Sequence, residues 1–431
     1  CGSIKRAKKL IPGGNMLLSK RSEIFLPDVW PSYFSKSKGC SVWSLEGKKF
    51  IDMSIMSVGT NILGYGHPEI DNAVRETINR GNMSSLNCPE EVELAERLID
   101  LHPWSDMAKF ARTGGEANAV AIRIARATTG KDKVAICGYH GWHDWYLAAN
   151  LKSSKNLNEH LISGLNTFGV PKSLEGTIFP FSYNNFSQLE KIIEENPEIG
   201  TIKLEVSRNL KPKNNFLKRI RDLSTKKNIV LIFDECTSGF RETFGGLHKK
   251  YNVNPDMAIF GKALGNGYAI TSIIGRKEIM EIAKNTFISS TFWTERVGPT
   301  AAIATLNVME KLKSWEIISK IGIKIKKRWQ DLAKKHKIEI NTFGLDPIPR
   351  FSFKSSNDFY YQTYMTQEML KKGYLSISSI FVCINHKEKI ISKYFKALDP
   401  IFKTIAECEK GKDIKNLISK KLPHTGFERL N

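Results

Sequence analysis

Between residues 108 and 275, short apolar runs alternate with longer amphipathic segments, and this order limits the possible folds more than any other feature of the chain. The runs predicted as buried strands are 133–137, 201–206, 229–233, 257–260 and 270–274. Helical segments lie between them, such as 116–128, which stops at Gly130, and 216–227. Strands that alternate with helices in this way form a mostly parallel sheet with helices on both faces. The sequence therefore predicts an α/β fold.

The segments on either side of this region have different patterns. Residues 1–54 are predicted as an N-terminal arm, because they contain a hairpin at 41–52 that turns at Gly47. Residues 55–305 form the predicted large domain. Residues 306–431, with their Lys-rich amphipathic helices and isolated strands, form a smaller C-terminal α+β domain. A chain of 431 residues is long enough for these separate cores.

The composition excludes several classes of protein. With 41% hydrophobic and 25% charged residues the chain is typical of globular proteins, and no apolar run reaches the roughly 18 residues that a membrane span needs. The basic N-terminus lacks the apolar core of a signal peptide. The 7 cysteines are widely spaced and odd in number, which favours a reducing compartment. We therefore expect a cytoplasmic protein without a membrane partner.

The chain is strongly basic. Lys and Arg outnumber Asp and Glu by 65 to 44, so the formal net charge is +21. Such a charge attracts polyanions, but the basic residues are spread along the chain without a nucleic-acid-binding motif. This pattern predicts a solvated basic surface and no specific nucleic-acid partner. A non-catalytic protein that binds polyanions through this surface is the remote alternative.

Thr113-Gly114-Gly115-Glu116 is a turn of small residues that opens an Ala-rich helical segment. Glycines allow the backbone to approach a ligand closely, and a helix N-terminus offers free N–H groups and a favourable dipole to an anion. The turn therefore suits a phosphate group, although an ordinary helix start has the same pattern. It is not a nucleotide-binding P-loop, because no GxxxxGK[ST] sequence occurs in the chain.

Asp234 and Glu235 follow directly on the predicted strand 229–233. Ligands of parallel sheets bind outside the carboxyl ends of the strands, so a carboxylate at this point is placed to meet one. Two adjacent acids cannot both face the same way. An Asp that caps the next turn is the alternative role.

Lys262 follows the predicted strand 257–260 and is flanked by Gly261, Gly265 and Gly267. Burial of a lysine lowers the pKa of its amine and frees the amine to form an imine with an aldehyde. In a Lys-rich chain, a single lysine more often lies on the surface. The case for a functional lysine therefore depends on the other motifs.

Together the motifs meet the demands of pyridoxal 5'-phosphate (PLP). The phosphate needs a helix N-terminus and the ring needs a planar partner, for which Tyr139 is a candidate. The pyridine nitrogen needs an acid, such as Asp234, and the aldehyde needs a lysine, such as Lys262. This combination of residues predicts PLP as the cofactor.

These motifs belong to a larger pattern that resembles the class III aminotransferases of the fold-type-I PLP enzymes, and in particular their glutamate-1-semialdehyde aminomutase branch. The similarity runs from Ile-Pro-Gly-Gly at 11–14 through Leu-Gly-Tyr-Gly-His-Pro at 63–68 to His386. Its most specific parts are 234–241 and 255–267. The resemblance implies the fold-type-I architecture, with an N-terminal arm and a smaller C-terminal domain beside the large one.

The resemblance also implies roles for single residues. Gly114 and Gly115 bind the phosphate through their amides, and Tyr139 stacks on the ring. Asp234 pairs with the pyridine nitrogen. Lys262 is both the Schiff-base lysine and the proton shuttle.

Further residues belong to the implied cofactor site. Thr113 and His140 flank the positions above, and Cys236 replaces an aliphatic residue that packs on the ring. Glu205 matches an acidic residue of the family near the cofactor, although a structural ion pair at a strand end has the same pattern. His140 and His143 lack the spacing of a metal site, so no metal is predicted.

The segment 290–294 falls where such enzymes lend a hydroxyl group to the phosphate of a neighbouring subunit. Thr291 is the first candidate for this contact, and Thr294 is the alternative, because the local spacing is longer than in the commoner family pattern. The resemblance therefore implies a homodimer with shared active sites.

Departures from the family pattern bear on the reaction. The aminomutases carry an arginine shortly after the first motif, where this chain has Asn-Met-Leu-Leu-Ser at 15–19, and Lys20 or Arg21 replaces it only with a shifted backbone. Near Ser378 this chain lacks the acidic residue that is typical of the aminomutases. Position 115 is Gly, where the family usually has a residue with a hydroxyl group. The loss of the arginine and of the acid favours an aminotransferase over an aminomutase.

We therefore predict an aminotransferase that moves an amino group from a donor, such as glutamate, to an aldehyde or ketone acceptor through an aldimine on Lys262. Sugars, acyl chains and specialised-metabolite ketones all fit as acceptors. The alternative is intramolecular amino transfer on glutamate-1-semialdehyde by an aminomutase.

Overall fold

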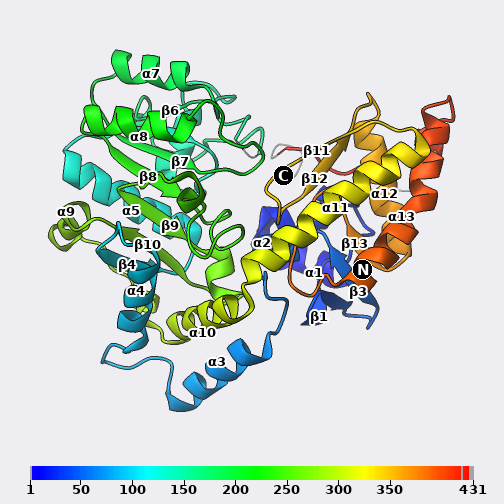
Figure 1. Ribbon diagram of the computed structural model, residues 1–431, viewed down its shortest axis with the longest axis horizontal. Helices are drawn as coiled ribbons and strands as arrows, with labels where there is room; N and C mark the ends of the chain where they lie inside the picture. Colours follow the sequence, from blue (N-terminus) through cyan, green and yellow to red (C-terminus); the bar gives the residue numbers. More distant parts are fainter. Residues whose placement is uncertain (1, 161, 419–420, 427–431) are drawn as a thin grey trace. The chain divides into compact units, whose positions relative to one another are not determined.

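The computed structural model describes residues 2–160, 162–418 and 421–426 (Figure 1). The chain divides into two compact units. The central unit is Pro68–Trp315, and the terminal unit combines Cys1–His67 with Glu316–Asn431. Every residue predicted to bind the cofactor lies in the central unit.

The central unit is built on a seven-stranded sheet with the strand order β4-β10-β9-β8-β7-β5-β6. These strands are β4 (Met107–Ala111), β10 (Thr271–Gly275), β9 (Met257–Phe260), β8 (Val230–Asp234), β7 (Ile199–Glu205), β5 (Lys133–Cys137) and β6 (Ile178–Pro180). β10 runs antiparallel to both of its neighbours, and the other pairs are parallel. The mostly parallel sheet is confirmed, and the ends of each predicted strand differ by at most two residues.

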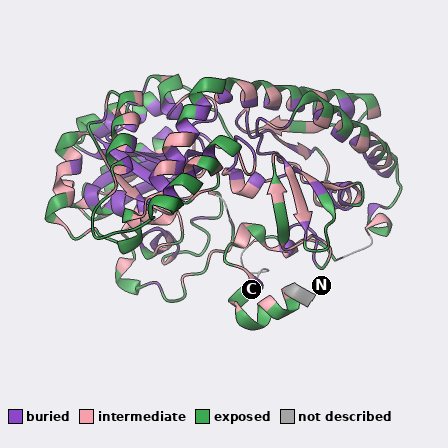
Figure 2. Ribbon diagram, turned by 90° about the horizontal axis from the view of Figure 1, so that it is seen from below, coloured by how far each residue is buried: buried purple, intermediate pink, exposed green. Residues whose placement is uncertain are grey.

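Both faces of this sheet are buried, as continuous apolar strands require. Every residue of β8 is buried. Ile232 belongs to the core cluster that packs against α5 (Gly114–Thr129), while its neighbour Phe233 is buried on the opposite face. α7 (Phe186–Glu195) packs against β5, and α8 (Phe216–Lys226) packs against β8 (Figure 1). Figure 2 shows buried residues concentrated in the strands of this sheet.

The ends of α5 explain why the predicted helix forms. Thr113 accepts a hydrogen bond from the backbone N–H of Glu116, and the Glu116 side chain accepts one from the backbone N–H of Thr113, which is a capping box. Gly130 ends the helix with a left-handed φ of 65°. The helix therefore starts two residues before the predicted 116–128 and ends one residue after it.

The remaining α-helices lie outside the alternating region or are short. They are α1 (Gly2–Leu10), α2 (Met56–Gly59), α3 (Pro68–Arg80), α4 (Glu90–Leu101), α6 (Asp144–Leu147), α9 (Lys277–Met280), α10 (Val297–Leu312), α11 (Ser314–His336), α12 (Asp358–Lys371) and α13 (Glu388–Cys408). Two 3₁₀ turns carry predicted site residues: η7 (Lys262–Gly265) and η9 (Thr291–Thr294).

The terminal unit has a sheet with the strand order β1-β2-β3-β13. Its strands are β1 (Phe34–Lys38), β2 (Ser41–Ser44), β3 (Lys49–Met53) and β13 (Tyr374–Ser376), and a separate antiparallel pair consists of β11 (Ile340–Phe343) and β12 (Arg350–Phe353). The predicted hairpin at 41–52 is present as the antiparallel pair β2 and β3. β3 also pairs in parallel with β13, so the predicted arm 1–54 shares one compact unit with most of the predicted domain 306–431.

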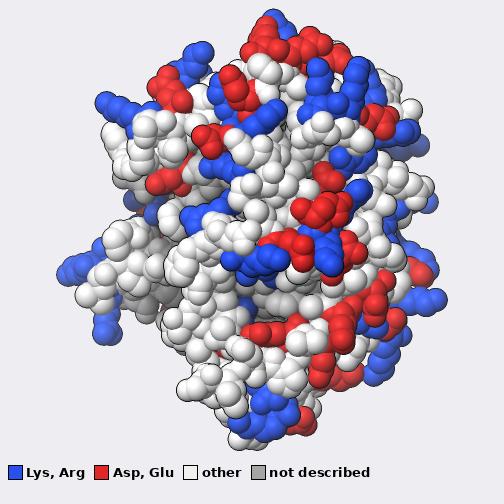
Figure 3. Space-filling model, turned by 90° about the vertical axis from the view of Figure 1, so that its left-hand side faces the viewer, with Lys and Arg blue, Asp and Glu red and all other residues white. Residues whose placement is uncertain are grey.

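The described residues carry both charges on their surface, and their cysteines are unpaired. Positive and negative side chains are interspersed on the face drawn in Figure 3, as in a solvated surface. Within residues 2–160, 162–418 and 421–426, no helix is long and apolar enough to cross a membrane, and no group of acidic, His and Cys side chains forms a metal site. The described cysteines are free thiols, and Cys1 lies outside the described residues.

Candidate active site

Three of the predicted motifs follow the carboxyl ends of strands that lie together in the sheet. Tyr139 and His140 come after β5, Asp234 ends β8, and Lys262 comes after β9. The carboxyl ends of parallel strands meet at one edge of a sheet, where ligands of α/β proteins bind. The topology therefore brings these residues to one edge of the central unit.

Asp234 and His140 form a buried pair. His140 Nδ1 lies 2.9 Å from Asp234 Oδ2, and Asp234 Oδ1 accepts a hydrogen bond of 3.1 Å from the backbone N–H of Cys236. Burial lowers the pKa of His140, so its ring is neutral and donates its Nδ1 proton to the carboxylate. Burial alone raises the pKa of Asp234, but the charge of Lys203 and the bond to His140 bring it below its ordinary value. Asp234 therefore stays ionised, and it caps the following turn as well.

Glu235 faces away from this pair, as expected for the second of two adjacent acids. Its Oε1 accepts a hydrogen bond of 3.0 Å from Ser238 Oγ, and its Oε2 contacts His248 Nδ1. Trp104 Nε1 donates to the other nitrogen of His248 at 2.9 Å. Glu235 is therefore held in a buried network of its own.

Lys262 lies at the start of η7, directly after Gly261. Its φ of 45° is in the left-handed region, which is uncommon for a residue with a side chain. Nζ donates a hydrogen bond of 2.8 Å to Thr237 Oγ1. Burial, and then repulsion by Arg208, lowers the pKa of Lys262 to about 8. The amine is thus poised between its charged and neutral forms near neutral pH.

Glu205 makes the structural ion pair that was the alternative to a cofactor contact. Its Oε1 lies 2.6 Å from Arg208 Nη2, and its Oε2 accepts a hydrogen bond of 3.1 Å from the backbone N–H of Tyr139. Arg208 Nη2 also donates to Thr237 Oγ1 at 3.3 Å. Thr237 therefore connects this ion pair to Lys262. Neither Arg208 nor Thr237 was predicted, although Thr237 lies within the specific motif at 234–241.

The glycine turn at the start of α5 has two kinds of close neighbours. A Cβ added to Gly114 would lie 3.6 Å from Cys236 Sγ, and one added to Gly261 would lie 3.4 Å from the same sulfur. Cys236 thus lies between the phosphate turn and the lysine turn. A Cβ added to Gly115 would lie 2.7 Å from Cε1 of His143. The ring of His143 therefore occupies the space that a side chain at position 115 would need.

Thr291 and Thr294 lie on the exposed turn η9. Thr294 Oγ1 donates a hydrogen bond of 2.8 Å to the carbonyl of Thr291. Within the described residues, no hydrogen bond links either hydroxyl group to the glycines of α5 in the same chain.

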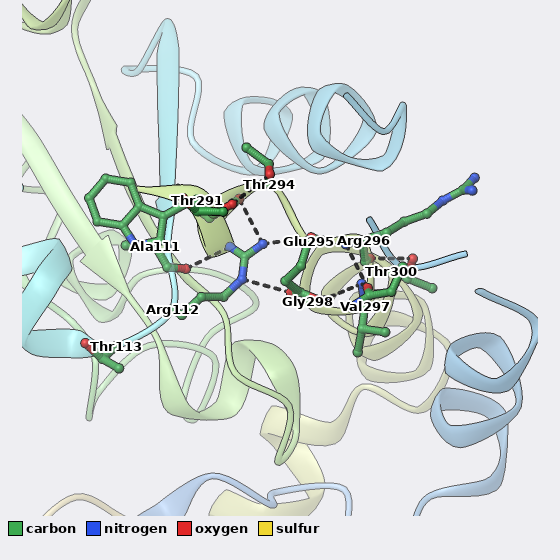
Figure 4. Close-up of polar contacts among 12 residues, drawn as sticks. Ala111, Arg112, Thr113, Thr291, Thr294, Glu295, Arg296, Val297, Gly298 and Thr300 are labelled. Carbon is green, nitrogen blue, oxygen red and sulfur yellow. Dashed lines mark hydrogen bonds and ion pairs between the residues drawn. The ribbon is translucent and has the colours of Figure 1, made fainter. Parts of the chain in front are cut away.

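Arg112 fixes this turn to the start of α5, a role that no sequence pattern predicted. Its Nη2 donates to the carbonyls of Trp293 and Glu295 at 2.9 and 2.8 Å, and its Nε lies 2.8 Å from Glu295 Oε1 (Figure 4). The same Oε1 accepts the backbone N–H of Gly298 in the first turn of α10. One arginine thus joins the N-terminal ends of α5 and α10 to η9.

The residues of the central unit fit PLP. A buried, ionised carboxylate at Asp234 suits a protonated pyridine nitrogen, and a lysine with a lowered pKa suits an aldehyde. Gly114 and Gly115 at a helix N-terminus suit a phosphate. The fold and this site together define a PLP-dependent transferase.

The comparisons with known proteins agree with this class. Residues 27–345 match the family Aminotransferase class-III. The 3-aminobutyryl-CoA aminotransferase of Cloacimonas acidaminovorans (strain Evry) is 32% identical over 420 residues, which cover 94% of this chain and 96% of the relative. The glutamate-1-semialdehyde 2,1-aminomutase of Methanothrix thermoacetophila is 31% identical over 423 residues, covering 91% of this chain and 94% of the relative. The chain belongs to the class III aminotransferase family and is a PLP-dependent enzyme.

A solved structure confirms the fold. The PLP internal aldimine form of the FumI protein of Sphingopyxis sp. MTA144 superposes with a TM-score of 0.85, covering 97% of this chain and 99% of that one at 21% identity. The predicted fold-type-I architecture is therefore confirmed.

Proposed function

We propose that this enzyme transfers an amino group between separate molecules, from a donor such as glutamate to an aldehyde or ketone acceptor, with Lys262 as the lysine that binds the cofactor. The observation that carries the proposal is the Lys262 amine itself, which is held by Thr237 at 2.8 Å and has a pKa of about 8. A neutral amine attacks an aldehyde and accepts a proton, whereas an ammonium group does neither.

Each neighbouring residue supports this chemistry in its own way. Bound PLP supplies an electron sink that stabilises negative charge developing on the amino carbon of the substrate. Asp234, held by His140 at 2.9 Å, keeps a proton at the pyridine nitrogen. Thr237 directs the Lys262 nitrogen, and the amides of Gly114 and Gly115 bind the phosphate. With the cofactor bound, the Lys262 amine would also hold and move the proton at the substrate carbon.

Residues of the terminal unit support transfer between molecules over the aminomutase reaction. An aminomutase must retain its intermediate between the two half-reactions, which requires contacts to the substrate carboxylate. The guanidinium of Arg21 packs against Gly13, where an added Cβ would lie 2.1 Å from Nη2. Ser378 stands near the position where the aminomutases have an acidic residue. Its hydroxyl donates a hydrogen bond of 2.8 Å to Gln362 Oε1. The similarity to an aminomutase of Methanothrix thermoacetophila keeps that reaction as the second candidate.

One relative supports one of the proposed acceptor classes. The similarity to a 3-aminobutyryl-CoA aminotransferase supports an acyl chain with a carbonyl group among the acceptors that the sequence left open. Sugars and specialised-metabolite ketones remain alternatives, and an acceptor screen decides among these classes.

We also propose a cytoplasmic homodimer. Thr291 and Thr294 are exposed, and aromatic side chains near the same turn are exposed as well: Phe287 is 85% and Phe292 is 68% exposed. Exposed apolar groups beside a ligand site are typical of protein interfaces. The free thiols of the described cysteines support a reducing compartment.

The proposed reaction is tested by separate addition of substrates to the PLP-loaded enzyme. Glutamate alone should convert the cofactor absorbance to that of pyridoxamine phosphate and release 2-oxoglutarate. Glutamate-1-semialdehyde alone should give little 5-aminolevulinate, because its intermediate is released. Efficient formation of 5-aminolevulinate, with no half-reaction on any amino donor, would instead identify an aminomutase.

A further inference from the structure

A lysine is buried inside the sheet of the central unit. Lys203 lies on β7, in register with Ile136 of β5 and Ile232 of β8, and it is 0% exposed. Both isoleucines belong to the apolar cluster that packs against α5. Lysines are almost never fully buried in such surroundings unless they are paired.

The strand register directs Lys203 toward the carboxylate of the site. Side chains two residues apart on a strand share a face, so Lys203 and Glu205 are on one face of β7. Glu205 is in register with Asp234 of β8, and Lys203 is in register with Ile232. Lys203 and Asp234 therefore lie on adjacent strands and on the same face, two residues apart along the strand direction.

The amine of Lys203 has no hydrogen-bond partner. Among the described residues, neither Lys203 Nζ nor the equally buried Nε2 of His140 forms a hydrogen bond. The other nitrogen of His140 lies 2.9 Å from Asp234 Oδ2. Burial of an unpaired charge is unfavourable, so Lys203 costs stability unless a nearby negative charge offsets it. Asp234 is the first of the groups placed to do so, and Glu205 on the same face is another.

Lys203, Asp234 and His140 shift one another's pKa values. The charge of Lys203, the hydrogen bond to His140 and the charge of His140 each lower the pKa of Asp234, in that order. Burial lowers the pKa of Lys203, and Asp234 is the first of the groups that raise it again, followed by Cys236 and Glu205. Burial lowers the pKa of His140, the hydrogen bond to Asp234 raises it, and the charge of Lys203 lowers it again, while the charges of Asp234 and Glu205 raise it. The buried residues of α5, which covers this face, are all non-titratable: Ala117, Asn118, Val120, Ala121, Ile122, Ile124 and Ala125.

We propose that Lys203 is a positioning residue of the active site, whose buried ammonium group keeps the Asp234 carboxylate ionised and the His140 ring neutral. The inference rests on the proposed function, in which Asp234 pairs with the pyridine nitrogen of PLP. Lys203 acts through Asp234 and His140 from within the sheet. Because like charges repel, its ammonium group also makes every other protonated, positively charged group nearby easier to deprotonate.

The test compares K203M, which removes the charge but keeps the chain length, with T201V as the matched control. Thr201 lies on the same face of β7 and has a buried hydroxyl without a partner, so T201V alters packing and polarity without changing charge. In the cofactor-free full-length chain, NMR of ¹³Cε1-labelled histidine follows His140, whose signal is assigned with H140N. We expect the His140 titration to move to higher pH by about one unit in K203M and to be unchanged in T201V.

A second measurement follows the PLP-loaded protein. The pH midpoint of the cofactor's visible absorbance should also rise in K203M and not in T201V, because one positive charge has been removed from its surroundings. An unchanged His140 titration in folded K203M overturns the inference. If K203M fails to fold, K203Q removes the same charge with a polar side chain, and the same result is required of it.

The variant D234N separates this inference from the proposed function. If D234N leaves the cofactor absorbance and its pH midpoint unchanged, then Asp234 does not pair with the pyridine nitrogen, and the proposed role of Asp234 fails. The His140 titration in the cofactor-free chain does not depend on that role. It therefore decides independently whether Lys203 controls the charge state of the pair.

Discussion

At the scale of single residues, the active site depends on keeping neighbouring groups in different charge states. His140 is neutral because it is buried, and Asp234 is ionised because Lys203 and His140 outweigh the effect of burial on its carboxylate. Lys262 has a lowered pKa because burial and Arg208 both disfavour its ammonium form. The pKa values of Asp234 and Lys262 are thus shifted by different neighbouring groups.

The lowered pKa of Lys262 gives a prediction about pH. A folded pKa of about 8, below the ordinary 10.5, means that the neutral amine accumulates as the pH rises through 8. When cofactor-free protein is mixed with PLP and quenched with borohydride, the rate of covalent labelling should rise with pH and level off above about 8. Peptide mapping should find the label on Lys262 and leave Lys249, another partly buried lysine, unlabelled. Label on a different lysine, or a midpoint near 10.5, would contradict the assignment.

Replacement of Asp234 tests the second half of the site. D234A should still bind PLP, but proton transfer at the substrate should slow by roughly 100-fold or more, because an unprotonated ring is a poorer electron sink. Single-turnover absorbance with glutamate measures this rate. D234N retains the size of the side chain and should be slowed as well, whereas a defect of D234A alone would indicate a folding fault. Near-normal turnover in both variants would mean that Asp234 only caps its turn.

The sequence predicted the residues that chemistry requires and missed those that hold them. Asp234 and Lys262 stand at strand ends in specific motifs, so their place in the site followed from the order of the elements. Lys203 lies in a predominantly apolar strand, and only the register of β7 against β8 brings it to Asp234. Arg208 and Thr237 meet through a contact between residues 29 positions apart. Local sequence patterns do not predict contacts between residues that are so far apart in the chain.

At the scale of elements, the start of α5 is closely packed by the loop that follows β5. Gly115 faces His143, and a Cβ added to Gly141 would lie 2.9 Å from the Cα of Gly115. The loop after β5 therefore packs directly against the first turn of the helix. Arg112 ties η9 to the same place through a hydrogen bond that spans 181 residues of sequence. The sequence pattern predicted the helix α5, but it did not predict that the loop after β5 and η9 contact its start.

This crowding predicts the outcome of G115S. The new Cβ would lie 2.7 Å from His143 Cε1, so the ring or the helix start must move, and overpacking of this kind costs about 1–3 kcal/mol of stability. We expect a lower melting temperature and weaker PLP binding, measured by thermal unfolding and by fluorescence titration. The double variant G115S/H143A should recover both, and H143A alone is the control. If G115S binds PLP as tightly as the wild type, then His143 does not limit this position.

At the scale of the whole molecule, the N-terminal and C-terminal regions of the chain belong to the same compact unit. β3 from the N-terminal region and β13 from the C-terminal region pair in parallel, with Tyr374 in register with Ile51. Sequence patterns identify such strands but not their partners, which is why residues 1–54 were predicted as a separate arm. The central unit, where neighbouring strands are close in sequence, was predicted far more completely.

The proposed homodimer gives the prediction that involves the whole molecule. If Thr291 or Thr294 completes the phosphate site of the neighbouring subunit, then a mixed dimer of K262A with T291A/T294A contains one site with both defects and one site with neither. Two inactive preparations should therefore regain activity when they are unfolded together and refolded, and sedimentation should find dimers. Refolding each variant alone is the control. A PLP-saturated monomer, or dimers without any recovery of activity, would place all the groups of the site within one chain.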